Sequence, residues 1–239
     1  MSDLTVIMLA GLAVLVGAVV QSGVGLGVGL VAAPVVTMLD PTLMPGCVLV
    51  TTLTLPIFTL SREAGHADWG GLKWALGGRV FGTMAGVWVV ASAPKNLLGL
   101  IVGGMVLAAV ALTAWKVRIA RNPRTLIAAG ATSGITGTST SIGGPPLAIL
   151  YQHAPGPQVR ATLGVYFTVG AVLSLSFLTI AGELTWREVL AGLALVPFTV
   201  TGFLISGPLR RFLDQGYTRA GVLVVTAASA TTLIIRSLA

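Results

Sequence analysis

The chain has 239 residues, of which 55% are hydrophobic and only 9% are charged, with 14 Lys and Arg against 7 Asp and Glu. A soluble domain carries roughly 25% charged residues, so a soluble globule is excluded, and the apolar content excludes disorder. The 31 glycines show no period of three, which excludes collagen. A helix that spans a bilayer needs about 20 mostly apolar residues. The sequence therefore predicts an all-α, polytopic integral membrane protein.

Apolar segments follow one another along the chain. They run at 4–38, 43–61, 70–92, 96–117, 125–151, 160–181, 187–207 and 216–237. Most have the length of one spanning helix, but 4–38 and 125–151 are too long and too rich in glycine for a single pass. Because Asp3 stands where a signal peptide has basic residues, we expect the first segment to be a retained membrane helix.

Basic residues gather in two loops and predict how the chain is threaded through the membrane. They are Lys116, Arg118, Arg121 and Arg124 in the first loop, and Arg210, Arg211 and Arg219 in the second. Cytoplasmic loops are rich in Lys and Arg, so we expect both loops in the cytoplasm. The two spans between these loops, 160–181 and 187–207, together bring the chain back to the side from which it started. The segment 125–151 must therefore cross an even number of times, as a re-entrant hairpin or as two short helices.

The two halves of the chain, 1–119 and 120–239, resemble each other weakly. An Ala-Gly-x-x-x-Trp motif at 64–69 recurs at 181–186, and each half opens with its long glycine-rich segment. By the loop charges the N-terminus lies outside, so the halves have opposite orientations. The sequence thus predicts two inverted-topology repeats of about four hydrophobic segments each, the first of each being broken or re-entrant. Secondary transporters commonly follow this plan.

Both glycine-rich segments are expected to interrupt their helices. The first runs from Gln21 through four glycines to Pro34, and the second has hydroxyl residues followed by Gly-Gly-Pro-Pro at 143–146. Glycine and proline disfavour a helix interior by about 1 and about 3 kcal/mol. At membrane depth, irregular backbone is tolerated only inside protein or beside a wet cavity. A proline pair suits the first turn of a new half-helix, and a helix N-terminus favours anions.

These segments predict a shared site for a small oxyanion. Neutral donors and backbone N–H groups suit such a ligand, and glycine lets it approach the backbone. The expected side-chain donors are Gln21, Ser22, Thr138, Ser139 and Ser141, and the expected backbone contributors are Gly25, Gly27, Gly143, Gly144 and Pro145. The single cysteine, Cys47, offers no disulfide or zinc chemistry, and we expect no metal and no cofactor.

Two arginines are candidates for the positive potential of this site. Arg79 is the one charge well inside an expected span, where ionisable residues are functional candidates; the alternative is a side chain that snorkels to the cytoplasmic face. Arg160 opens a later span, where it either attracts an anion to the pore mouth or marks the cytoplasmic boundary. No carboxylate lies in the middle of a span, so we expect coupling to protons to be absent or indirect.

A different role is expected for the glycines of the span 70–92. Gly78, Gly82 and Gly86 repeat at four-residue spacing, which is typical of helices that pack closely in membranes. We therefore expect these three glycines to serve packing rather than binding.

The paired glycine-rich segments resemble those of the sulfite exporter TauE/SafE family. The most telling stretch reads Gly-x-x-Ser-Gly-x-x-Gly at 130–137 and then Gly-Gly-Pro-Pro-Leu at 143–147; the family often has glycine where Val28 and Ser141 stand. Size and duplicated layout are also similar, so the resemblance covers nearly the whole chain. It implies transport of sulfite, organosulfonates or related small anions across the inner membrane, and we expect alternating access at a midplane site.

The expected partners are a small inorganic or organic anion and the lipid bilayer, and assembly into a homo-oligomer stays open. Nucleic acid is not expected, because no basic face lies outside the loops. Two alternatives remain. One is an intramembrane Ser/His hydrolase that uses Ser139 or Ser141 with His153. The other is a structural or regulatory membrane subunit whose glycines serve packing alone. The lack of intramembrane acids disfavours a cation carrier.

Overall fold

The computed structural model describes residues 3–25, 27–57, 64–92, 95–114, 119–213, 227–228, 230–232 and 234–235. No strand occurs in these residues, and the predicted all-α fold is confirmed. The helices are α1 (Asp3–Val24), α2 (Val28–Leu39), η1 (Pro41–Leu43), α3 (Gly46–Thr52), η2 (Ala64–His66), α5 (Trp69–Ser92), α6 (Lys95–Ala114), α7 (Pro123–Thr140), α8 (Gly144–Tyr151), α9 (Gly156–Ile180) and α10 (Trp186–Leu213).

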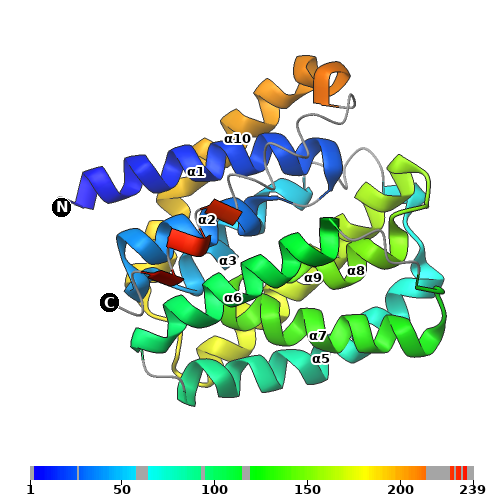
Figure 1. The fold of residues 1–239 in the computed structure, drawn as a ribbon, viewed down its shortest axis with the longest axis horizontal. Helices are drawn as coiled ribbons and strands as arrows, with labels where there is room; N and C mark the ends of the chain where they lie inside the picture. The colour runs from blue at the N-terminus through cyan, green and yellow to red at the C-terminus, as the bar shows by residue number, and fades with distance from the viewer. Residues whose placement is uncertain are drawn as a thin grey trace.

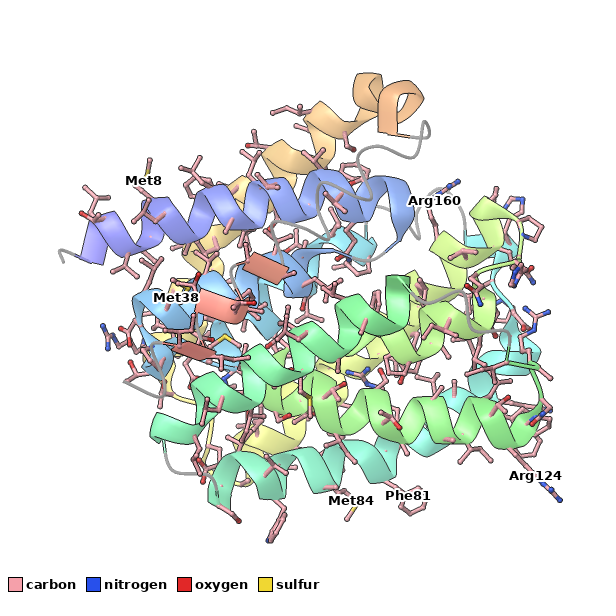
Figure 2. The ribbon with its side chains drawn as sticks, viewed as in Figure 1. Met8, Met38, Phe81, Met84, Arg124 and Arg160 are labelled. Atoms are coloured by element: carbon pink, nitrogen blue, oxygen red, sulfur yellow. The ribbon has the colours of Figure 1, made fainter. Side chains whose placement is uncertain are left out.

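Within the described residues, four helices are long and apolar enough to cross a membrane: Leu4–Ser22 of α1, all of α5, all of α9 and Trp186–Ser206 of α10. Large apolar side chains cover their outer surface. Phe81 is 73% exposed, and Figure 2 shows it pointing away from the bundle together with Met84. Large apolar patches on a protein surface mark contact with another apolar phase, so this surface is suited to lipid.

Some sequence expectations fall outside the described part of the chain. Most of the expected span 216–237 lies there, as do Lys116, Arg118 and Arg219. The expected loop before that span begins later than predicted. Helix α10 continues to Leu213, so the backbone at Arg210 and Arg211 is helical.

The first glycine-rich segment folds as a helical hairpin. Helix α1 ends at Val24 and α2 begins at Val28, and Gly25 between them has a φ of 88°, which favours glycine. The chain then turns back along α1: a Cβ atom added to Gly17 would lie 2.8 Å from the Cα atom of Val28. With 12 residues, α2 is about 18 Å long, which is too short to cross a hydrocarbon core of about 30 Å.

The second glycine-rich segment also folds as a hairpin. Asn122 caps α7, its side chain accepting the Thr125 N–H, and α7 ends at Thr140 before α8 returns beside it. The last residue of α8 lies close to the residues that precede α7, because the Arg121 guanidinium is 4.8 Å from the ring centroid of Tyr151. With eight residues, α8 is about 12 Å long. Both glycine-rich segments are therefore broken, as the sequence predicts.

The two hairpins run in opposite directions and exchange packing partners. In Figure 1 α1 starts beside the N-terminus on the left, whereas Arg124, in the first turn of α7, lies at the right in Figure 2. Helix α5 of the first half packs along α7 of the second, and α10 of the second half packs along α1 of the first. The long helix of each half therefore supports the broken segment of the other.

Glycines form the seam between α5 and α7. A Cβ atom added to Gly78 would overlap the carbonyl oxygen of Ile127, and one added to Gly82 would overlap that of Ala131. From the opposite side, a Cβ atom on Gly130 would overlap the carbonyl oxygen of Ala75. Helices that meet backbone to backbone gain close van der Waals contact in lipid. The packing role predicted for these α5 glycines is confirmed.

A leucine at Gly82 is expected to separate α5 from α7. Because the new side chain would meet backbone rather than a movable side chain, the overpacking should cost about 1–3 kcal/mol or more. We expect the Gly82→Leu protein to lose its folded, monodisperse form in detergent at a temperature well below that of the parent. The matched control is Gly77→Leu on the same helix, where an added Cβ atom meets no atom within 4 Å. Equal melting temperatures for both variants would contradict the seam.

Candidate anion site

The two helix breaks meet at one cavity of about 50 Å³. A single water needs about 10–15 Å³ on the same measure, so the space accommodates a small solute. The cavity is lined by a subset of the predicted site residues, namely Gln21, Gly27, Arg79, Ser141, Gly143, Gly144 and Pro145. Direct contact joins the breaks, because a Cβ atom on Gly29 would overlap the carbonyl oxygen of Ser141. The structure thus brings both glycine-rich segments to a common space.

Arg79 supplies the charge of this cavity. It projects from α5, is only 3% exposed, and lines the cavity. Its guanidinium donates from Nη1 to the hydroxyl of Ser133 at 3.1 Å and lies 4.8 Å from the ring centroid of Tyr166. Gly170 leaves the space for it, since a Cβ atom there would overlap the guanidinium. The alternative of a snorkelling side chain is not what the structure shows.

The charge of Arg79 has no counter-ion among the described residues. Asp68 pairs with Arg121, and Asp40 pairs with Arg187. No acidic side chain lines the cavity in the described part of the chain, and the Nε atom of Arg79 has no hydrogen-bond partner. A buried cation without a partner is costly. An anion in the cavity would supply the negative charge that this guanidinium lacks.

Ser133 fixes the position of this guanidinium. Its hydroxyl is fully buried, accepts the hydrogen bond from Arg79 and donates to the carbonyl oxygen of Gly143 in the second break. One side chain of α7 therefore holds both the cation and the turn before α8. The hydrogen bond also engages a carbonyl whose oxygen is repulsive to an anion.

Removing this hydroxyl is expected to weaken anion binding without removing the charge. In Ser133→Ala the guanidinium loses a partner and the Gly143 carbonyl loses its donor, and a hydrogen bond to a charged group contributes about 1.5–3 kcal/mol. The expected result is a loss of apparent affinity of about tenfold or more, measured as the anion concentration that gives half-maximal flux. Ser133→Thr, which keeps the hydroxyl, should retain more affinity than the alanine variant. Unchanged affinity in Ser133→Ala would contradict the positioning role.

The helix N-termini contribute less than predicted. An α-helix leaves its first N–H groups free, but Pro145 and Pro146 have none, so α8 offers few of them. In α2, the Val28 N–H donates to the side-chain carbonyl of Gln21 at 2.9 Å. The side-chain oxygen of Gln21 therefore accepts a hydrogen bond at the start of α2, and its NH2 group is the part that can donate to an anion. The arginine, rather than the helix dipoles, is the main positive element.

Several predicted donors are directed elsewhere. Ser22 and Ser139 do not line the cavity, because their hydroxyls donate to Ala18 and Ile135 one turn back in their own helices. This local bond is common for serine in a helix. The Thr138 hydroxyl pairs with that of Ser174, also away from the cavity.

Ser141 lines the cavity, but its hydroxyl donates to the carbonyl oxygen of Pro45 at 3.0 Å. It has a φ of 61°, the left-handed conformation that glycine adopts without cost. This backbone geometry explains why glycine is suited to this position.

Two further predicted residues lie outside the cavity lining. Gly25 forms the turn after α1, and a Cβ atom on it would be 3.6 Å from the Cα atom of Arg160. Arg160 is partly exposed, and Figure 2 shows it at the edge of the molecule, beside the end of α1. The structure therefore places Arg160 near the first break but not beside Arg79.

Sequence reasoning missed other lining residues. They are Gly29, Leu30, Leu49, Thr52, Gly137, Ile142, Phe167 and Ala171. Gly29 and Gly137 belong to the glycine-rich segments, and their pattern was a usable signal. Leu49 and Thr52 come from the α3 region and Phe167 comes from α9. Nothing in the sequence distinguishes these residues from ordinary residues of apolar helices.

The geometry does not support a Ser/His hydrolase. Ser141 precedes α8 and His153 follows it, and eight helical residues span about 12 Å, far beyond a hydrogen bond. His153 is exposed, and the Ser139 hydroxyl donates to Ile135. No serine–histidine contact is found at this cavity in the part of the chain that the structure describes.

The buried carboxylate of Glu188 is also fully engaged. One of its oxygens accepts the N–H of Gly46 at 3.0 Å, and the other accepts the N–H and hydroxyl of Thr185 at 2.7 and 2.8 Å. It caps α3 and forms a capping box at the start of α10. Glu188 therefore has a structural explanation that needs no proton relay.

Comparison with known proteins places this geometry in a family. The family model described as Sulfite exporter TauE/SafE matches residues 9–233. The match includes both hairpins and the arginine between them, so it covers every element that forms the cavity. No curated protein and no solved structure was found to match the chain.

Proposed function

Because the chain belongs to the sulfite exporter TauE/SafE family of membrane transporters for sulfur anions, we propose that it carries a small sulfur oxyanion through the Arg79 cavity. The buried guanidinium without a counter-ion carries this proposal. A sulfite or sulfonate group presents several oxygens to the planar N–H fork of arginine, an arrangement that gives strong charge-assisted hydrogen bonds.

The proposed mechanism is alternating access. We infer two inverted repeats from the opposite directions of α1 and α7 and from the exchanged pairs α5–α7 and α10–α1. Rocking of one repeat against the other around a central site is how many such transporters work. The cavity lies where the two half-helices α2 and α8 begin, so a relative motion of the halves would open it to one side at a time.

The proposed driving force is the membrane voltage, with the protein in the cell inner membrane. No acidic side chain lines the described part of the cavity to carry a coupled proton. An anion that leaves a cell with a negative interior gains about 2.3 kcal/mol per charge and 100 mV, and this gain is sufficient for export.

Flux through the purified chain tests this function. Proteoliposomes with and without an imposed voltage are to be assayed for sulfite and methanesulfonate uptake, with protein-free liposomes as the control. We expect uptake that saturates with concentration and is accelerated when the interior is positive. Uptake equal to the protein-free control would reject transport and favour a structural or regulatory subunit. Stoichiometric acidification of one side during uptake of methanesulfonate, which carries no titratable proton, would reject the voltage-driven mechanism alone.

A further inference from the structure

The described lining of the cavity carries one formal charge. Among the described residues that line it, Arg79 is the only one with a formal charge, and Gln21, Thr52 and Ser141 are its polar but neutral neighbours. Tyr166 faces the guanidinium with its ring and donates its hydroxyl to the Gly130 carbonyl at 3.3 Å. None of these neighbouring side chains supplies a second positive charge.

Backbone dipoles do not supply it either. Two of the first three residues of α8 are prolines without N–H groups, and the first N–H of α2 is already accepted by Gln21. The partial charge at a helix N-terminus comes largely from such free N–H groups. Both helix ends at this cavity are therefore weaker anion sites than unblocked ends.

The rest of the wall is apolar. Leu30 and Leu49 come from the α2 and α3 side, and Phe167 and Ala171 come from α9. An ion that enters such surroundings loses its hydration shell. If its charge is not fully compensated there, the electrostatic attraction does not offset this desolvation cost. A monovalent anion is balanced by Arg79, whereas a dianion leaves one negative charge unpaired. The apolar wall also accepts a methyl substituent in place of a charged oxygen.

We propose that this cavity selects sulfur oxyanions with a single negative charge and discriminates against dianions of similar size. The inference rests on the proposed transport function and adds the charge state of the substrate. The shared chemistry is a sulfur centre with several oxygens and one net charge, which bisulfite and small organosulfonates both provide. The two sources are separated by the assay.

The test is a competition and pH series on the full chain in proteoliposomes. Sulfite uptake is measured in the presence of competing anions. Methanesulfonate is the monovalent competitor, and sulfate and thiosulfate are the divalent competitors. We expect methanesulfonate to inhibit at a concentration at least about tenfold below that of either dianion, as one uncompensated charge demands. Sulfite uptake should follow the bisulfite fraction across the second pKa of sulfurous acid, while methanesulfonate uptake stays constant. Subtracting the flux into protein-free liposomes corrects for neutral sulfur dioxide.

The outcomes separate this inference from the function. Absence of uptake for every anion rejects the transport function. Transport in which sulfate competes as well as methanesulfonate, or in which sulfite flux follows the dianion fraction, overturns charge selection and leaves transport intact. Uptake of methanesulfonate but not bisulfite identifies organosulfonates as the source, and the reverse identifies bisulfite; both agree with the proposal.

A second cation in the cavity gives an independent test. Thr52 lines the cavity, and its hydroxyl donates to the Leu49 carbonyl of its own helix. In Thr52→Lys we expect the preference for methanesulfonate over sulfate to be at least about tenfold lower than in Thr52→Met, whose side chain has a similar length and no charge. A lysine variant that transports methanesulfonate and still rejects sulfate as strongly as the parent counts against the proposal.

Discussion

Replacing Arg79 with glutamine should abolish anion flux while the protein still inserts and folds. The variant loses the one charge of the described cavity lining, and removing one partner of a buried ion pair costs about 3–5 kcal/mol. A loss of at least about 100-fold in transport efficiency is therefore expected, since each 1.4 kcal/mol is about tenfold. Arg79→Lys should recover little, because an ammonium lacks the planar fork that Ser133 and Tyr166 hold in place.

The measurement is the initial rate of sulfite or methanesulfonate uptake in proteoliposomes with matched protein content. Arg124→Gln is the control, because Arg124 is exposed in the first turn of α7 and does not line the cavity. Parent-like flux in Arg79→Gln would show that the buried guanidinium serves packing alone. An inactive Arg124→Gln protein would show instead that loss of any basic residue is sufficient.

A leucine at Gly143 should close the site. An added Cβ atom would lie 2.9 Å from the Ser133 carbonyl oxygen and 3.0 Å from Nη1 of Arg79. The longer side chain would occupy the cavity and displace the guanidinium. We expect flux to fall to the level of protein-free liposomes, with membrane insertion unchanged in a fractionation assay.

The matched control for this variant is Gly104→Leu on α6. That glycine is exposed, and a Cβ atom added there meets nothing within 4 Å. Gly143→Ala is a graded test, because a single methyl group would press on the Ser133 carbonyl oxygen without filling the cavity and should leave partial flux. Normal transport by Gly143→Leu would place the anion path elsewhere in the protein.

The backbone of the candidate site was more predictable than its side chains. Glycine and proline act locally, so their pattern predicted the interruptions between α1 and α2 and between α7 and α8. The loop charges predicted that the segment 125–151 turns back, and the contact between Arg121 and Tyr151 agrees with a hairpin. Arg79 was identifiable because an isolated charge in an apolar span needs an explanation.

Hydrogen-bond direction was not predictable from the sequence. A serine in a helix either faces a cavity or donates to the carbonyl one turn back, and the sequence does not distinguish these states. Ser22 and Ser139 were expected to bind the anion, yet both donate within their helices. Ser133, which holds Arg79 in place, was missed because its role depends on a residue of the other half.

The seam between α5 and α7 also divides the site between the two halves of the chain. Arg79 belongs to α5, and its backbone carbonyl faces Gly134 across the seam, whereas Ser133 and Gly143 belong to the other half of the chain. A shear displacement of α7 along α5 would therefore pull the guanidinium away from its hydroxyl partner. Such a displacement would then couple release of the anion to the conformational cycle.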